Sequence, residues 1–470
     1  MIIPDITFSV GRRYAAVTDE AMLSYNLDEK NKYYSLYTHI RDDILSGKLK
    51  KGFQLPSKRA MSENLSVSVV TVQNAYDQLL AEGYIYSKER SGYFVEEVNA
   101  DFYGRRELPE REQEQKAGYK LDLVKGSTLT EMFPFSVWSR LMRGVLSDCG
   151  EHLLQRVPCD GDGELKRAVA SYLYRARAID IDPRYIVIGA GAEYLYGIIV
   201  QLFGRDKLYA VENPGYGKIY SSYILNGASV ACISVTETGI DCGEVEKSGA
   251  HVVHFSPSHQ FPTGAVAPVS ERLRLIKWAR ENDGYIIEDD YDSEFRLVGK
   301  PLQCAHNLCP DRVIYMNTFS KSLAPSMRMG YMVLPPKLYE RYLKLFSSSA
   351  CAVPLFEQKT LAKMLDGGFF ERHISRLKNR YKSVRQAIYD KVKTLPYHAD
   401  IYDTGSGLHL LIRFPSAKSD EEIKEKARQN GINLKCLSDY LLAPAPVSDK
   451  CAIINYSGVT ERQIENIEIK

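Results

Sequence analysis

A single lysine stands among small hydroxyl residues in residues 318–328, Thr-Phe-Ser-Lys-Ser-Leu-Ala-Pro-Ser-Met-Arg. Lys321 follows an apolar run that is typical of a strand, so it can project from the carboxyl end of a sheet. A lysine in such a place can form a Schiff base once burial and nearby cations lower the pKa of its amine. Arg328 and the hydroxyls of Thr318 and Ser320 can hold a phosphate. The segment therefore predicts a covalent site for a phosphorylated aldehyde.

An apolar strand end runs into acids and a tyrosine in residues 286–292, Ile-Ile-Glu-Asp-Asp-Tyr-Asp. Asp289 can pair with a pyridinium nitrogen and keep the ring an electron sink, and Tyr291 can hydrogen-bond a ring hydroxyl. Together with Lys321 these are the groups that pyridoxal 5'-phosphate (PLP) needs. The sequence therefore predicts PLP as the cofactor.

Three further turns supply candidates for the same site. Gly191, Ala192 and Glu193 open a helix, and its backbone N–H groups can bind an anion. Tyr216, at the end of Glu-Asn-Pro-Gly-Tyr, can stack on the cofactor ring. His259 lies in a polar turn, Ser-Pro-Ser-His-Gln-Phe-Pro-Thr-Gly, that follows a predicted strand.

Each candidate alone has a simpler structural explanation. Lys321 alone would be a surface lysine, Asp289 a helix cap, and Tyr216 a core residue. The glycine turn at residues 189–191 would be an ordinary connection. Their order and spacing within one domain favour the cofactor site.

The segments that position these residues alternate between β-like and helical patterns. Apolar strands separated by helices indicate a buried, mainly parallel sheet, so an α/β domain is expected. We place its large domain at about residues 165–335 and a small domain in the flanking parts, with strands at 409–414 and 451–456 and a helical stretch at 357–392. The strands expected in the large domain are residues 185–189, 207–211, 229–233, 252–255, 285–288, 313–316 and 330–334.

Residues 33–97 predict a separate α+β module. Helix, helix, turn, helix and hairpin follow one another, which is the order of a winged helix-turn-helix. We expect the helices at residues 35–45, 59–65 and 69–82 and the hairpin strands at 84–86 and 92–95. Eight basic and eight acidic residues leave the module without net charge, so placement rather than overall charge supports binding to double-stranded DNA. The candidate DNA contacts are Ser57, Lys58, Arg59, Ser68, Thr71, Arg90 and Gly92.

The bulk properties of the 470 residues exclude several classes of protein. A net charge of +2 gives no whole-chain case for nucleic acid or membrane binding. The nine cysteines are scattered and form no Cys-x-x-Cys pair, so neither a disulfide framework nor a metal site is predicted. Reduced thiols and the lack of a signal peptide favour a cytoplasmic protein. Residues 1–32 form an extension, either a disordered arm or an added helix, and residues 98–120 a charged linker.

Both parts of the sequence resemble known protein families. Residues 121–470 look like a fold-type I, aminotransferase-like PLP domain, and residues 33–97 resemble the winged helix of GntR-type repressors. The fusion resembles the MocR family of bacterial transcriptional regulators. The resemblance implies Lys321 as the Schiff-base lysine, Asp289 and Tyr291 as ring partners, and Arg328 and Thr318 at the phosphate. It also implies a head-to-tail homodimer that associates with the nucleoid when bound to DNA.

Some positions depart from the family pattern. Aminotransferase relatives usually carry a late arginine that clamps the substrate carboxylate, and residues 451–457 contain none. Arg413 is the nearest upstream candidate for contact with an effector, and Lys218 is a second. Glu193 stands where the family often has glutamine, beside a dianionic phosphate. Val69 stands where related repressors usually have arginine, and it can either contact a thymine methyl or signal altered DNA binding.

Three functional hypotheses follow. The leading one is a transcriptional regulator that senses an amine, an amino acid or PLP through Lys321 without needing turnover. The alternative is a catalytically active PLP-dependent aminotransferase with an attached winged helix, against which the missing arginine counts. A third is a scaffold that no longer binds PLP. The sequence does not name the effector, the operator, or the direction of regulation.

Overall fold

The computed structural model describes residues 23–28, 31–98, 118–124, 126, 130–297, 303–405, 407–446 and 450–467. The chain divides into two compact units, residues 1–116 and 117–470. The predicted linker, residues 98–120, spans this division, and its residues 99–117 lie outside the described part of the chain.

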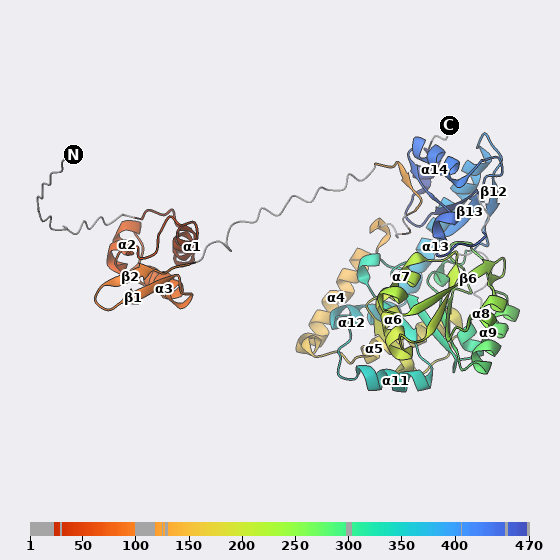
Figure 1. The fold of residues 1–470 in the computed structure, drawn as a ribbon, viewed down its shortest axis with the longest axis horizontal. Coiled ribbons are helices and arrows are strands. Elements are labelled where there is room, and N and C mark those ends of the chain that lie inside the picture. The colour runs from red at the N-terminus through yellow and green to blue at the C-terminus, as the bar shows by residue number, and fades with distance from the viewer. Residues whose placement is uncertain are drawn as a thin grey trace, which may run out of the picture. The chain divides into compact units, whose positions relative to one another are not determined.

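The first unit is a winged helix-turn-helix (Figure 1), as predicted. Its core is built from the apolar faces of the helices, with Leu36 and Ile40 packed against Val72, Tyr76 and Leu79. Those residues recur at helical spacing, which is why the sequence pattern identified the three helices. The elements are α1 (Lys32–Leu45), α2 (Lys58–Leu65), α3 (Val69–Ala81), β1 (Ile85–Lys88) and β2 (Gly92–Val95).

Part of the predicted N-terminal extension packs onto this unit. Leu23 is buried, the Tyr25 hydroxyl donates to Asp43 at 2.8 Å, and the Tyr25 ring stacks on His39. Residues 23–28 therefore belong to the winged-helix core rather than to a free arm. Residues 1–22, which make up most of the predicted extension, lie outside the described part.

The second unit is built around an eight-stranded sheet. The strand order is β4-β11-β10-β9-β8-β5-β6-β7, and all neighbours are parallel except those of β11 and β7. The central strands are apolar and buried on both faces, which explains their continuous hydrophobic sequence. The strands are β4 (Ile186–Gly189), β5 (Leu208–Asn213), β6 (Ser229–Thr236), β7 (Gly239–Ile240), β8 (Val252–Phe255), β9 (Tyr285–Asp289), β10 (Val313–Thr318) and β11 (Gly330–Val333).

Helices cover both faces of this sheet (Figure 1). On one face Leu195 and Tyr223 pack against Val187, and on the other Leu275 and Trp278 pack against Val253. Both layers are needed because each strand buries both sets of alternating side chains. The helices of the large domain are α4 (Phe135–Cys149), α5 (Gly163–Arg177), α6 (Ala192–Phe203), α7 (Gly217–Leu225), α8 (Cys242–Ser248), α9 (Val269–Glu281), α10 (Ala305–Leu308), α11 (Pro336–Phe346) and α12 (Leu355–Asp366).

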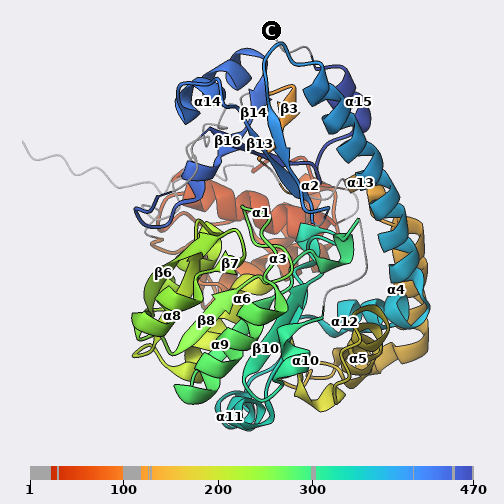
Figure 2. The same ribbon diagram turned by 90° about the vertical axis from the view of Figure 1, so that its right-hand side faces the viewer.

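The small domain forms from both flanks of the large one (Figure 2). Its four-stranded sheet has the order β12-β13-β16-β15, and β3, which follows the predicted linker, pairs with β14. The predicted helical stretch at residues 357–392 is two helices, because Gly367 and Gly368 end the first of them. The elements are β3 (Leu121–Asp122), α13 (Phe369–Lys393), β12 (Asp400–Tyr402), β13 (His409–Arg413), α14 (Asp420–Gln429), β14 (Ile432–Asn433), β15 (Lys435–Cys436), β16 (Cys451–Asn455) and α15 (Glu461–Glu465). No helix in the described ranges has the length and apolar character that a membrane span requires.

Candidate functional site

The candidate cofactor residues lie at the carboxyl ends of parallel strands. The loops after β4, β5, β8 and β10, and the end of β9, carry every one of them. Carboxyl ends of parallel strands share one edge of a sheet, which is where ligands bind in α/β folds. Figure 2 shows the small-domain strands β13 and β16 next to this part of the large sheet. The site therefore lies between the two domains of the second unit.

Lys321 follows β10 and extends toward the small domain. Its Nζ donates to the carbonyl oxygen of Gly126. Burial lowers the pKa of Lys321, Asp292 partly opposes this, and Lys218 lowers the pKa further. A lowered pKa increases the fraction of neutral amine, which is the nucleophilic form.

Asp289 ends β9 in a buried position with two hydrogen-bond partners. The Tyr196 hydroxyl donates to its Oδ2 at 2.8 Å, and His254 Nε2 lies 3.3 Å from the same oxygen. Tyr223 continues the chain, with its hydroxyl 2.7 Å from His254 Nδ1. Sequence reasoning missed these three residues, because nothing in the spacing of α6, α7 and β8 shows that they meet. They hold the Asp289 carboxylate in one orientation.

His259 joins the two domains of the site. Its Nδ1 lies 3.0 Å from Asp292 Oδ2 and 3.3 Å from the Tyr291 hydroxyl, and its ring is 4.4 Å from that of His409. Burial, with Asp292 and Asp289, raises the pKa of Tyr291 well above 10, so its hydroxyl stays protonated. A Cβ at Gly407 would overlap His259 and Asp292, so this close approach of the small domain requires glycine.

His259, Asp292 and His409 place possible metal-ligand atoms within 4.8 Å of one another, the one such group found in the described ranges. The sequence predicted no metal site, since these residues are far apart along the chain. The hydrogen bond from His259 to Asp292 accounts for that pair, and His409 Nε2 lies 3.1 Å from the Pro262 carbonyl oxygen. Burial lowers the pKa of His409 well below 6.5, helped by His259 and Lys321, so its ring is neutral at pH 7.

The predicted phosphate contacts gather at the start of α6. Gly191 caps the helix with φ +88°, and the Arg328 guanidinium lies against it. Glu193 pairs with Lys218 at 3.0 Å and with Arg328 at 3.4 Å. The hydrogen bond from Lys218 lowers the pKa of Glu193, although burial opposes it, and the charges of Lys218 and Arg328 lower it further. Glu193 therefore holds the two cations that a phosphate would use.

The remaining cofactor candidates surround this position. Ala192 begins α6, Thr318 ends β10 in a buried position, and Ser320 is half-buried in the turn before Lys321. Tyr216 precedes α7, remains 44% exposed, and meets Phe261 edge to face with ring centroids 5.8 Å apart. Its ring is accessible for stacking.

The two candidate effector residues lie in different places. Lys218 belongs to the phosphate end, through Glu193. Arg413 is exposed and lines a cavity of about 990 Å³ whose lining also includes His259 and His409. A smaller cavity of about 290 Å³ in the apolar small-domain core is lined by none of the candidate residues.

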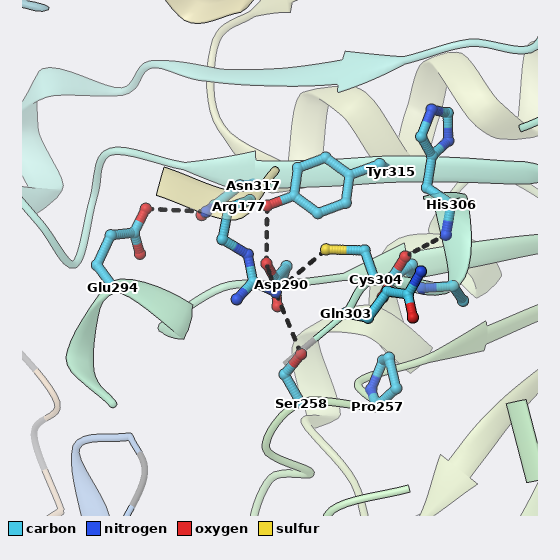
Figure 3. Close-up of polar contacts among 12 residues, drawn as sticks. Arg177, Pro257, Ser258, Asp290, Glu294, Gln303, Cys304, His306, Tyr315 and Asn317 are labelled. Atoms are coloured by element: carbon cyan, nitrogen blue, oxygen red, sulfur yellow. Dashed lines mark hydrogen bonds and ion pairs between the residues drawn. The ribbon is translucent and has the colours of Figure 1, made fainter. Parts of the chain in front are cut away.

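A buried polar layer lies behind the site (Figure 3). Arg177 pairs with Asp290 at 2.8 Å, and Tyr315 donates to the same carboxylate at 2.7 Å. Glu288 accepts the backbone N–H groups of Ala305 and His306, each at 2.9 Å. Burial, with Asp290, raises the pKa of Glu288 to about 7. Since strand residues alternate in direction, Glu288 and Asp290 anchor the segment while Asp289 and Tyr291 point toward the cofactor position.

The candidate DNA contacts lie at helix starts and at the wing of the first unit. Ser57 caps α2 and Ser68 caps α3, where it also bonds the Thr71 hydroxyl at 2.8 Å. Arg59 is exposed on α2, whereas Lys58 bonds Gln73. At the wing tip Arg90 and Gly92 both have positive φ, and both are exposed. Val69 and Val70, at the start of α3, are 44% and 66% exposed.

These residues fit PLP. A half-buried lysine with a lowered pKa lies near an anchored carboxylate and a protonated tyrosine, and two cations and a helix start lie at one end. Amine, pyridine, ring-hydroxyl and phosphate partners are therefore all present within one unit.

Comparison with known proteins identifies the family of each unit. The "Bacterial regulatory proteins, gntR family" pattern matches residues 32–95, and "Aminotransferase class I and II" matches residues 137–467. The chain is 35% identical over 437 residues to the "Uncharacterized HTH-type transcriptional regulator YdeL" of Bacillus subtilis, covering 92% of this chain and 94% of that protein. It is 30% identical over 444 residues to the "Probable rhizopine catabolism regulatory protein MocR" of Rhizobium meliloti, covering 90% of each. The Pyrococcus horikoshii kynurenine aminotransferase structure matches with a TM-score of 0.66 at 23% identity, covering 74% of this chain and 88% of that one.

Proposed function

Because this chain belongs to the MocR-type family of transcriptional regulators, in which a GntR winged helix is joined to an aminotransferase class I and II domain, we propose that it is a PLP-binding regulator of transcription. An amine, an amino acid or PLP is sensed through a Schiff base at Lys321. The observation that carries the proposal is the buried Lys321 amine, with its lowered pKa, among partners for every part of PLP.

The residues of the second unit have distinct roles in this proposal. Lys321 supplies the amine, Asp289 accepts from the pyridine nitrogen, and Tyr291 donates to the ring hydroxyl. Arg328 and the start of α6 hold the phosphate. PLP, when bound, supplies an aldehyde and an electron-withdrawing ring. Tyr196 and His254 keep the Asp289 carboxylate in place through their contacts with Oδ2.

The first unit binds an operator in double-stranded DNA. Exposed Arg59 and Arg90 contact phosphates, the start of α3 enters the major groove, and Ser57, Ser68 and Thr71 position the helix starts. Lys58 contributes less, because Gln73 and the Tyr93 ring already engage its amine. The chain acts in the cytoplasm as a homodimer, and effector binding changes the affinity for DNA.

Absorption spectroscopy of the purified full-length chain tests this function. A visible Schiff-base band that disappears in Lys321→Ala, together with a change in DNA affinity on adding an amine or amino acid, supports the regulator. Repeated conversion of an amine and a keto acid would instead establish an aminotransferase. No band after addition of PLP would reject the cofactor and leave a scaffold.

A further inference from the structure

The Lys321 amine lies beside Asn455 at the end of the small-domain sheet. A Cβ at Gly126 would overlap both Asn455 Nδ2 and Lys321 Nζ, so the two nitrogens face the same glycine. Asn455 is buried, and its Oδ1 accepts from the Ser457 hydroxyl at 2.9 Å. The strand register pairs Asn455 with His409, which places both residues at this end of the sheet. Substituents next to a reacting nitrogen would therefore meet an amide and an imidazole.

The charged groups around Lys321 do not favour a ligand carboxylate in addition to the cofactor phosphate. Asp292 is a buried carboxylate close enough to raise the pKa of Lys321. Lys218 and Arg328 are the nearby cations, and Glu193 pairs with both. His409 is neutral at pH 7, because burial lowers the pKa of its imidazole. In the described part of this pocket, the Asp292 carboxylate is therefore present, and both nearby cations are already paired with Glu193.

Arg413 lines the same cavity as His409, but its backbone lies at the far end of β13 from His409. It pairs in register with Cys451, at the opposite end of the strand from the His409–Asn455 pair. Arg413 lies four residues after His409 on β13, so their Cα atoms are about 13 Å apart. A carboxylate on the carbon next to the reacting nitrogen would thus be desolvated beside Asp292 without a cationic partner among the described residues, which is unfavourable.

An aromatic wall extends from the cofactor position into the small domain. The centroid of the Phe261 ring lies 5.8 Å from that of Tyr216, 5.0 Å from that of His409 and 5.0 Å from that of Tyr440. These rings present apolar surface next to the stacked imidazole rings of His259 and His409. The wall suits the body of an apolar amine.

We infer that the effector is a primary amine with an apolar body and no carboxylate next to its nitrogen. This inference rests on the proposed function, since it needs PLP on Lys321. With PLP bound to Lys321, the amine nitrogen would replace Nζ in the carbon–nitrogen double bond to the cofactor aldehyde carbon. Both N–H protons of the neutral amine would pass to Nζ, which would leave as a neutral amine, and no oxidant or reductant would be consumed.

Matched pairs of ligands test the inference on the full-length chain loaded with PLP. The probes are 2-phenylethylamine against L- and D-phenylalanine, and 3-methylbutylamine against leucine, which differ only in the carboxylate. Calorimetry measures the affinity for each probe, and absorption spectroscopy measures the shift of the visible band. The affinity for DNA is measured with each probe present. We expect each amine to bind about 100-fold more tightly than its amino acid, equivalent to about 2.7 kcal/mol.

Two variants at one position sharpen the test. Asn455→Arg places a cation beside Lys321 and should move the preference toward the amino acids by at least tenfold. Asn455→Gln keeps the amide and should retain the preference for amines, so it controls for a change in side-chain size.

The outcomes separate the two proposals. Amino acids that bind as tightly as the amines, or a loaded chain that responds to neither, would overturn this inference and leave PLP binding intact. Lys125 precedes Gly126 in the sequence and lies outside the described residues. Tight amino-acid binding that is lost in Lys125→Ala would overturn the inference as well, and would assign the carboxylate to that lysine. Absence of a visible band in every sample would instead reject the proposed function.

Discussion

The two units of the chain place their candidate functional side chains in opposite ways. In the first unit Arg59, Ser68 and Arg90 lie exposed, at helix starts and a wing tip that are close in sequence. In the second unit Lys321, Asp289 and their partners are largely buried and come from strand ends and loops between residues 126 and 455. The exposed set can change with little effect on folding, whereas the buried set links function to stability. Each prediction below tests one side of this contrast.

The largest effect is expected at Lys321. Lys321→Ala removes the amine that we assign to the Schiff base, so the visible band should vanish completely. Absorption spectroscopy with excess PLP measures this, and Lys344→Ala on exposed α11 serves as the control. Persistence of the same covalent band in Lys321→Ala would reject the assignment.

The buried ion pair behind the site should dominate the stability of the second unit. Asp290→Ala leaves the Arg177 guanidinium buried without its carboxylate, which should cost about 3–5 kcal/mol in the free energy of unfolding. Urea denaturation followed by circular dichroism measures the loss. Glu246→Ala, which breaks the equally close but exposed pair with Arg274, is the matched control and should change stability little. Equal losses in the two variants would refute the contrast between buried and exposed sets.

A pH-dependent effect is expected at Glu212, which ends β5. Burial raises the pKa of this carboxyl to about 8, while the Ser256 backbone and Gln260 oppose the shift. The native state therefore keeps a proton that the unfolded state loses, so stability declines as the pH rises from about 4.5 to about 8. Glu212→Gln removes this decline, so the free energy of unfolding of the variant relative to the wild type should rise by about 3.5 kcal/mol between pH 5 and pH 8.

The measurement is urea denaturation of both proteins at pH 5, 6.5 and 8. Glu281→Gln, an exposed position on α9, controls for the loss of one carboxylate. A difference between Glu212→Gln and the wild type that stays constant across this range would show that the carboxyl titrates normally.

The smallest effect on the molecule itself is expected at Arg59. Arg59→Ala should leave stability unchanged, weaken DNA binding several-fold across sequences, and reduce the salt dependence by about one counterion. Fluorescence anisotropy at several salt concentrations measures both quantities. Arg41→Ala removes a charge that Asp42 already pairs on α1, and is the control. Unchanged binding in Arg59→Ala would remove this residue from the interface.

The elements most accurately predicted from sequence were those whose pattern is local. The recognition helix begins at Val69 as expected, because Ser68 caps it and Val72 and Tyr76 recur on one face. Seven strands of the large sheet were predicted because their apolar runs are buried on both faces, whereas the two-residue strand β7 was missed. α4 was missed although its apolar residues recur at helical spacing, and Val145 is its one buried residue.

The sequence by itself determined the two units, the candidate lysine and the strand end that carries Asp289. Only the tertiary structure decided which residues surround them. Tyr196, His254 and Asn455 reach the site from α6, β8 and β16, and no spacing along the chain relates these elements. The sequence places the Glu193 carboxylate next to a phosphate, and only the tertiary structure shows that salt bridges with Lys218 and Arg328 compensate its charge. Local periodicity fixes where helices and strands form, whereas charge compensation depends on contacts that exist only after the chain has folded.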